Sequence, residues 1–386
     1  MNTKIRIAID AKNLALYSGG IAQWFAPLLQ AWAQSSVDTH QQYEFFIIAP
    51  AGQGLKSVDF TGLTNTKFIS PSWPTFLIRQ LRHVLYDNWI FPRIIAQLKP
   101  QCIVSPYHDV LLPKKSKGIF SIMTIHDLCF LEVPRAYPWS IRTYYLWMLR
   151  RNLARANHIL TISQTTQRQL VDLFQIPEKC ISVIPNTLAP EFLEVKLTAD
   201  RAVAWKEQYL LPTHQAVLYA SGVGHRKNIE RMLAAMRLLW SQGSQIQLWI
   251  TGEVDSRWRH LFLEAELATR KIIFLGFLSL SDLRLAYESA DAVIYPSLCE
   301  GFGRSCLEAM VCGTPLACSN IAVFREVTAS YPQYFDPLNV NSIATAIRLT
   351  LQQKRQQPIR DARYQESIVK TGFIETMDRL VNESQS

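Results

Sequence analysis

The chain has 386 residues, of which 48% are hydrophobic and 18% charged, a composition that excludes a disordered or fibrous protein. Because one hydrophobic core seldom grows past roughly 250–300 residues, the length predicts two domains. The net charge is +9, and all of the excess lies in residues 1–180, with 19 Lys and Arg against 10 Asp and Glu. No run of 18 uncharged apolar residues occurs and residues 1–10 lack the apolar core of a signal peptide, so we expect a cytoplasmic protein without a spanning helix.

Short apolar segments rich in Ile, Val and aromatic residues alternate with helical patterns along the first half of the chain. Buried parallel strands have this composition. The expected strands are 4–9, 43–49, 102–105, 119–125, 158–162 and 181–184. The expected helices are 20–34, 75–97, 137–156 and 164–174.

The second half of the chain repeats this alternation. Its expected strands are 216–220, 245–251, 272–275, 292–295 and 315–318, with helices after Asn228, Ser256, Ser279, Arg304 and Asn341. Alternating strands and helices predict an α/β fold of two Rossmann-like, doubly wound parallel-sheet domains that face a central cleft. We place these domains at 1–188 and 189–365, followed by a C-terminal helix in 366–386.

The seven cysteines suggest no metal site. Cys299, Cys306, Cys312 and Cys318 are separated by six, five and five residues, which matches no zinc spacing, and their neighbours are apolar. We interpret them as small buried hydrophobic residues. No Asp-x-Asp pair occurs either, so we expect no bound metal ion.

Two loops of the first half follow expected strands and carry candidate functional groups. Gly19 and Gly20 open a helix, where backbone N–H groups favour an anion; the alternative is a flexible turn. His126 directly follows the strand 119–125 and is placed to face a cleft, because ligands of doubly wound sheets bind at the carboxyl ends of strands. The alternative is a His126–Asp127 hydrogen bond that only shapes the loop.

A glycine-rich loop in the second half combines two cations with a helix N-terminus. Residues 222–228 read Gly-Val-Gly-His-Arg-Lys-Asn and include Gly222, Arg226 and Lys227. Flexible backbone, adjacent positive charges and the helix dipole together suit a diphosphate. The alternative is a solvated turn.

The strongest motif pairs two carboxylates, Glu300 and Glu308, eight residues apart. Glu300 stands in a loop after the strand 292–295 and is followed by Gly301 and Gly303, whose N–H groups can bind an anion. Glu308 lies on the next helix. Carboxylates at this spacing can hold hydroxyls at two ends of a ligand, although Ser305-x-x-Glu308 is also a capping box in which Glu308 only bonds the backbone.

These motifs, in this order, resemble a retaining glycosyltransferase of family 4, the group 1 transferases with the GT-B fold. The match covers nearly the whole chain. Residues 297–303, 307–310 and 312–315 resemble the family's E-x7-E signature, 226–228 its phosphate-binding loop, and 9–11 with 19–21 its N-terminal donor loop. The family often has Leu-Pro after Glu-Gly-Phe-Gly, whereas this chain has Arg304-Ser305, which concerns the identity of the sugar.

The resemblance implies a role for each matching residue. Glu300 would hold hydroxyls of the donor sugar, Glu308 the ribose, and His126 would lie beside the anomeric carbon. Arg226 and Lys227 would neutralise the diphosphate. The glycines and aromatic residue expected to complete the donor site are Gly19, Gly20, Gly222, Gly301, Phe302 and Gly303. The C-terminal helix would cross back onto the first domain.

The implied reaction moves a hexose from a nucleotide-diphosphate sugar with retention, by front-face attack and without a metal or other cofactor. We expect mannose from a GDP-sugar, with a UDP-sugar as the alternative, and a lipid-linked saccharide acceptor in the synthesis of a cell-surface polysaccharide such as lipopolysaccharide. The helices 75–97 and 137–156 are basic and rich in aromatic residues, which favours peripheral contact with anionic membrane, unless their apolar faces are ordinary core.

Two other functions fit parts of the sequence. A sugar-nucleotide epimerase or hydrolase on the same two-domain scaffold would consume the donor without an acceptor. A nucleic-acid-binding protein would use the basic first half but would not need the Glu300–Glu308 pair or the Arg226–Lys227 loop. We therefore expect no nucleic-acid partner.

Overall fold

The computed structural model describes residues 4–12, 14, 20–39, 43–50, 64–72, 79–115, 118–195 and 198–385. The chain divides into two compact units. Unit 1 comprises Met1–Leu128, Trp139–Asn186 and Ser367–Ser386, and unit 2 comprises Cys129–Pro138 and Thr187–Glu366. No helix of the described ranges is both long and apolar enough to cross a membrane.

Unit 1 contains a parallel sheet of seven strands in the order β3-β2-β1-β4-β5-β6-β7. The strands are β1 Ile5–Asp10, β2 Tyr43–Ile48, β3 Thr66–Ile69, β4 Cys102–Ser105, β5 Phe120–Ile125, β6 His158–Thr161 and β7 Ile181–Val183. Six of them lie where the apolar segments predict them. The exception is β3, an edge strand with Phe68 55% exposed, which lacks the apolar character of a buried strand.

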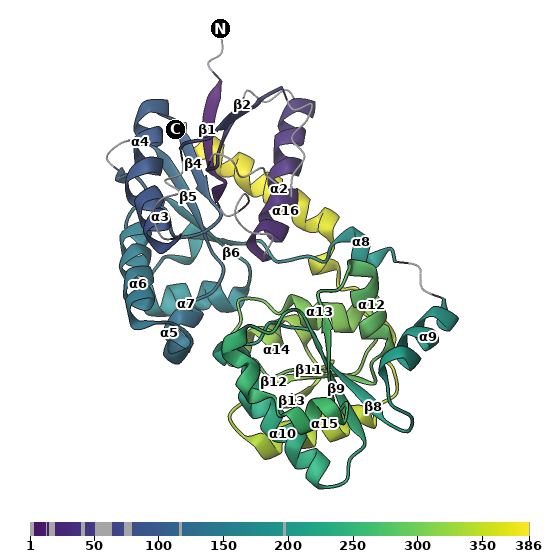
Figure 1. Ribbon diagram of the computed structural model, residues 1–386. Coiled ribbons are helices and arrows are strands. Elements are labelled where there is room, and N and C mark those ends of the chain that lie inside the picture. Colours follow the sequence, from purple (N-terminus) through teal and green to yellow (C-terminus); the bar gives the residue numbers. More distant parts are fainter. Residues whose placement is uncertain are drawn as a thin grey trace. The chain divides into compact units, whose positions relative to one another are not determined.

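The helices of unit 1 pack around this sheet (Figure 1). They are α2 Gly20–Asp38, α3 Arg79–Leu85, α4 Phe91–Leu98, α6 Trp139–Leu153, α7 Gln164–Phe174 and α16 Glu366–Glu383. The last helix, drawn in yellow, joins a core formed early in the chain. The ring of Phe373 packs edge-on against Phe25, and the indole of Trp32 donates a 2.8 Å hydrogen bond to Asp378.

The expected helix 75–97 is confirmed over its described part, which is helical throughout but contains one π-helical turn. After α3 the chain forms a π-helical turn, Tyr86–Ile90, in which the N–H of Phe91 reaches the carbonyl of Tyr86, and α4 begins only then. Pro92 explains this wider turn, because proline has no N–H to donate to the preceding turn and its ring crowds that turn. Residues 75–78 of the prediction lie outside the described residues.

Unit 2 contains a second parallel sheet, of six strands in the order β10-β9-β8-β11-β12-β13. The strands are β8 Gln215–Tyr219, β9 Ile246–Thr251, β10 Ile272–Gly276, β11 Ala292–Tyr295, β12 Leu316–Ser319 and β13 Gln333–Phe335. The helices are α5 Cys129–Glu132, α8 Pro190–Leu193, α9 Ala199–Tyr209, α10 Ile229–Ser241, α11 Glu264–Ala268, α12 Leu280–Ser289, α13 Arg304–Val311, α14 Ala322–Thr328 and α15 Val340–Leu351. The expected fold class, two doubly wound parallel-sheet domains, is confirmed.

The order in which successive strands are added to each sheet reverses once. This switch point lies between β1 and β4 in unit 1 and between β8 and β11 in unit 2. On either side of such a point the crossover helices cover opposite faces of the sheet, so the loops after the two central strands separate and leave a crevice. In unit 2 the flanking loops are those after Tyr219 and Tyr295. A ligand site is therefore expected where these two loops meet.

The helix after the second of these loops ends at a glycine with a demanding geometry. Gly313 follows α13 with a φ of 65°, and a Cβ added there would lie 2.2 Å from the carbonyl oxygen of Gln356. The backbone of Gln356 also donates a 2.8 Å hydrogen bond to the Gly313 carbonyl. Only glycine combines this φ with so close an approach of a second backbone segment.

Candidate functional site

The two loops at the switch point of unit 2 are joined by a three-residue ion cluster. Arg226 and Lys227 form a short 3-10 turn after β8, and Glu300 stands in the loop after β11. Glu300 Oε2 accepts a 2.6 Å hydrogen bond from Arg226, and Glu300 Oε1 accepts one of 2.5 Å from Lys227. The structure thus brings together three predicted site residues from positions more than 70 apart in the sequence.

Two further contacts hold the Glu300 loop in place. Ser297 donates a 2.7 Å hydrogen bond to Glu300 Oε1, and the guanidinium of Arg226 also bonds the carbonyl of Cys299 at 3.0 Å. Asn228 ties the same loop to the rest of the unit through its amide, which bonds the carbonyls of Pro296 and Pro337. The loop carboxylate therefore has a local structural role as well, which the sequence alone did not indicate. The position of Ser297, three residues before Glu300 in the same loop, is the signal by which the sequence could have indicated it.

The ion pairs control the protonation of Glu300. Burial acts to raise the pKa of this carboxyl, but Lys227 and Arg226 outweigh it and lower the pKa to about 2 from its ordinary 4.5. The carboxylate is therefore ionised throughout the physiological range. An anionic Glu300 between two cations leaves this cluster with a net charge of +1, which suits a polyanion.

The lowered pKa of Glu300 predicts a dependence of stability on pH. A carboxyl with a lower pKa in the folded than in the unfolded chain stabilises the fold above pH 4.5, and this contribution is lost as the pH falls from 4.5 to about 2. We expect the difference in melting temperature between the wild-type chain and Glu300→Gln to shrink steadily over this range. A difference that stays constant from about pH 6 to about pH 3 would contradict the ion-pair assignment.

Glu308 is not part of a capping box. The residue at the start of α13 is Gly303, with a φ of 106° and no side-chain cap, and the hydroxyl of Ser305 bonds the carbonyl of Ala220 at 3.3 Å. Glu308 Oε2 instead accepts a 2.7 Å hydrogen bond from Tyr287, and its Oε1 lies 3.3 Å from the Nε of Arg304. The carboxylate is thus held in a side-chain network, and the alternative interpretation of Ser305 and Glu308 is wrong.

The network around Glu308 includes residues that carry no signal in the sequence. The hydroxyls of Tyr287 and Tyr295 lie 2.5 Å apart, and both side chains are buried. Burial and the nearby Glu308 raise the pKa of Tyr287, so the phenol stays protonated and donates to the carboxylate. Tyr287 comes from α12, whose residues follow an ordinary helical pattern.

His126 lies in unit 1 directly after β5, as its position in the sequence predicts. Its Nε2 carries the proton, because it makes a 2.8 Å hydrogen bond to the carbonyl of Pro106, which can only accept. The ring packs edge-on against Trp24, and burial lowers the pKa of the imidazole. His126 is therefore neutral and fixed in orientation by its neighbours.

The remaining predicted residues differ in what the structure shows of them. Gly20 is the exposed first residue of α2, whereas Gly19 lies outside the described residues. The carbonyl of Gly222 accepts a 2.9 Å hydrogen bond from Tyr219. Gly301 is buried, and the ring of Phe302 packs edge-on against Tyr364. Phe302 thus has a packing role within unit 2.

Unit 1 has a buried charged cluster at its own switch point, which the sequence analysis missed. Lys12, fully buried after β1, forms ion pairs with Asp87 and, at 2.7 Å, with Asp109, which follows β4. Asp10 lies beside them, and burial raises its pKa to about 7 against the opposing effect of Lys12. Lys12, Asp87 and Asp109 are far apart in the sequence and belong to no motif, so only the strand order reveals that they lie together.

The interpretation of the cysteines is wrong for Cys299. Its sulfur is bonded to that of Cys129, 170 residues earlier, and both belong to unit 2. Cys102, Cys306, Cys312 and Cys318 are buried free thiols, as expected, and Cys180 is half-buried. Widely separated cysteines give no local spacing signal, and disulfides are rare in the cytoplasm where this chain was expected.

The disulfide predicts a count of thiols. Of seven cysteines five are free, so the chain denatured without reductant should expose five reactive thiols, and seven after reduction. A cross-link over 170 residues restricts the unfolded chain and stabilises the fold by about 5 kcal/mol in the chain-entropy treatment. Reduction should therefore lower the melting temperature of the wild type but not that of Cys129→Ser. Seven thiols in the unreduced chain would show that the bond is absent.

Comparison with known proteins identifies relatives of both units. Residues 19–192 match the family described as Glycosyltransferase Family 4, and residues 204–366 match Glycosyl transferases group 1. The O-antigen chain mannosyltransferase RfbU of Salmonella typhimurium is 26% identical over 76% of this chain and 77% of its own length. The O-antigen chain mannosyltransferase B of Escherichia coli is 30% identical over 63% of this chain and 64% of its own length.

Solved structures share the architecture of the chain. Anabaena HepE, crystallised in complex with UDP and glucose, aligns with a TM-score of 0.64 over 99% of both chains at 16% sequence identity. At this identity the likeness concerns the fold, a pair of parallel-sheet domains of the GT-B type.

Proposed function

Because the chain belongs to the family 4, or group 1, glycosyltransferases, we propose that it transfers mannose from a nucleotide-diphosphate sugar to a lipid-linked saccharide. The product would extend a cell-surface polysaccharide such as lipopolysaccharide. The observation that carries this proposal is the Arg226–Lys227–Glu300 cluster at the switch point of unit 2. In this assignment residues 189–365 bind the donor, residues 1–188 bind the acceptor, and 366–386 return to the first domain.

The cluster supports a mechanism in which the protein stabilises the leaving diphosphate. Negative charge develops on the diphosphate as the bond to the sugar breaks, and fixed cations lower the energy of that state. Arg226 and Lys227 supply the cations, and the backbone N–H groups of Gly20, Gly222, Gly301 and Gly303 are proposed to complete the anion site together with Gly19.

The carboxylates are proposed to select the donor. Glu300 would exchange part of its ion pairing for hydroxyls of the sugar, while Glu308, oriented by Tyr287, would bind the ribose. His126 is proposed to lie beside the anomeric carbon, where its fixed imidazole orients the sugar. Retention then follows from front-face attack, in which a phosphate oxygen of the donor takes the acceptor proton. No metal or other cofactor is required in this scheme.

The sugar is inferred from the relatives. Both O-antigen enzymes are described as mannosyltransferases, which supports mannose and, with it, a GDP donor. HepE was solved with UDP, so a UDP-sugar is the second candidate. Arg304 stands where the family often has leucine and its Nε lies 3.3 Å from Glu308 Oε1, so we propose that it influences the choice of donor.

The acceptor and a membrane surface are proposed to meet unit 1. Leu81 and Trp89 are each 52% exposed, and Trp147, on α6, is 43% exposed with the guanidinium of Arg151 over its ring. Exposed tryptophans flanked by cations are suited to the interface of an anionic membrane. A cytoplasmic enzyme bound to the inner face of the membrane is consistent with this surface.

Incubation of the purified chain with radiolabelled nucleotide sugars, with and without a lipid extract, tests the proposal. We expect label to enter the lipid fraction from GDP-mannose in the presence of the extract, and chelation of metals with EDTA to leave the rate unchanged. Loss of the donor without an acceptor would instead identify an epimerase or hydrolase. A nucleotide sugar that is neither consumed nor bound would overturn the proposed function.

A further inference from the structure

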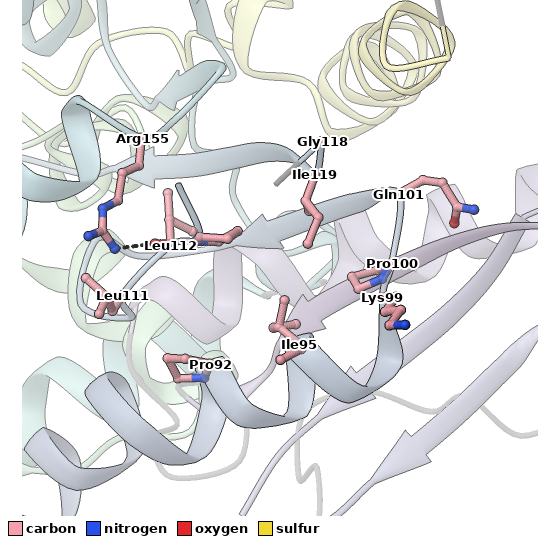
Figure 2. A pocket seen from close by; sticks show the side chains of 12 residues that line it. Pro92, Ile95, Lys99, Pro100, Gln101, Leu111, Leu112, Gly118, Ile119 and Arg155 are labelled. Carbon is pink, nitrogen blue, oxygen red and sulfur yellow. Dashed lines mark hydrogen bonds between the residues drawn. The ribbon is translucent and has the colours of Figure 1, made fainter. Parts of the chain in front are cut away.

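Unit 1 contains a cavity that is not lined by His126. The cavity has a volume of about 610 Å³ and lies between α4 and the chain at Leu112 and Ile119, as Figure 2 shows. Part of its lining precedes strands: Pro100 and Gln101 lead into β4, and Gly118 and Ile119 lead into β5, while Leu111 and Leu112 lie in the connection between these strands. His126 follows the opposite end of β5, and a six-residue strand spans about 20 Å.

The lining of the cavity is mainly apolar. α4 contributes Pro92, Ile95 and Ala96, and the chain between β4 and β5 contributes Leu111 and Leu112. Ile95 and Leu112 are buried, whereas Ala96 is exposed on the helix. A space of this size between aliphatic side chains accepts a hydrocarbon chain but offers few partners for a polar ligand.

The charged groups at the cavity all have one sign. Lys99 at the end of α4 and Arg155 after α6 line it, and no carboxylate of the described residues does. Arg155 is held in place by a 2.6 Å hydrogen bond to the carbonyl of Leu112. Lys114 and Lys115 are exposed on the adjoining loop, and among the described residues they and Lys99 form no ion pair through their side chains.

We propose that this cavity binds an anionic membrane lipid, with one acyl chain between α4 and the loop at Leu111 and the phosphate at Lys99, at the end of the cavity away from Arg155 (Figure 2). Charge complementarity favours an anion, and the apolar lining favours its hydrocarbon chain. Trp89, which is 52% exposed and belongs to the surface proposed to contact the membrane, lies one turn before Pro92, which lines the cavity. The proposed membrane surface therefore extends to the cavity. The lipid serves as an anchor, because Lys99 and the residues that lead into β4 and β5 lie at the opposite end of these strands from His126.

The proposal predicts that affinity depends on chain length. In isothermal titration calorimetry on the full chain, we expect dodecyl phosphate below its critical micelle concentration to bind at least about tenfold more tightly than hexyl phosphate, because each buried methylene adds affinity. Inorganic phosphate should bind more weakly still. Equal affinity for inorganic phosphate and dodecyl phosphate would mean an anion site alone and would overturn the proposal.

Matched variants separate the cavity from the rest of the surface. Ala96→Trp should fill the mouth and weaken dodecyl phosphate binding about tenfold, whereas Gln97→Trp, on the same helix but outside the cavity, should leave it unchanged. Lys99→Gln should weaken all alkyl phosphates about fivefold, and Arg93→Gln should not. Both tryptophan variants alter exposed positions, so circular dichroism should show an intact fold.

Vesicles test whether the ligand comes from the membrane. Wild-type chain should sediment with phosphatidylglycerol-containing vesicles more strongly than with phosphatidylcholine vesicles, and Ala96→Trp should reduce this binding while Gln97→Trp does not. Equal sedimentation of Ala96→Trp and wild type would overturn the proposal. None of these measurements involves a nucleotide sugar, so the cavity and the proposed glycosyl transfer can fail independently.

Discussion

Replacing Lys227 with alanine is expected to lower the rate of glycosyl transfer about a hundredfold or more, because removing one fixed donor to a developing anion typically costs about 3 kcal/mol in the barrier. The substitution should leave the fold intact, since Glu300 keeps its hydrogen bonds to Arg226 and Ser297. The measurement is transfer of labelled sugar by the purified variant, with its melting temperature recorded alongside.

A matched control removes a cation of the same unit that lies outside the cluster. Arg257 is 80% exposed and pairs only locally, two residues away, with Asp255, so Arg257→Ala should retain nearly full activity. Comparable losses in the two variants would indicate a general effect of charge. Near-normal turnover by folded Lys227→Ala would remove Lys227 from the mechanism.

The second large effect concerns stability. Gly313→Ala should destabilise unit 2 by about 3 kcal/mol or more, because alanine disfavours a positive φ by roughly 1–2 kcal/mol and the new Cβ would also displace the Gln356 backbone. The backbone of Gln356 cannot yield as a flexible side chain would, since it is bonded to Gly313 itself. Urea unfolding followed by circular dichroism measures the change.

Gly372 provides a control of opposite sign. It lies inside α16, and nothing stands within 4 Å of a Cβ added there. Alanine has the higher helix propensity, so Gly372→Ala should stabilise the chain by about 0.5–1 kcal/mol. If both variants were destabilised equally, the close approach at Gly313 would not be the cause.

Most of the fold could be predicted because its strands are buried and therefore apolar. The boundaries of β4 and β11 agree with the sequence pattern to the residue. The strands that were missed, β3 and β13, lie at sheet edges, have three or four residues and are only partly buried. These two strands lack a continuous apolar segment, so the sequence pattern does not detect them, whereas the other two edge strands, β7 and β10, begin with isoleucine-containing apolar segments and were predicted.

The candidate site could be predicted where the strand order alone determines it. Arg226, Lys227 and Glu300 follow adjacent strands of one sheet, so their loops had to meet. The partner of Glu308 could not be predicted, because Tyr287 reaches it from a helix whose rotation depends on packing. The Cys129–Cys299 bond was missed for the same reason: it joins segments that only the tertiary fold brings together.

The position of α16 has a consequence for synthesis of the chain. Residues 187–366, which make up nearly all of unit 2, leave the ribosome before Phe373 and Asp378, the partners of Phe25 and Trp32 in unit 1. Translation proceeds at about 5–20 residues per second, so part of the aromatic core of unit 1 stays uncovered while these residues are synthesised. A premature stop codon just before α16 would damage the part of the protein that is translated first.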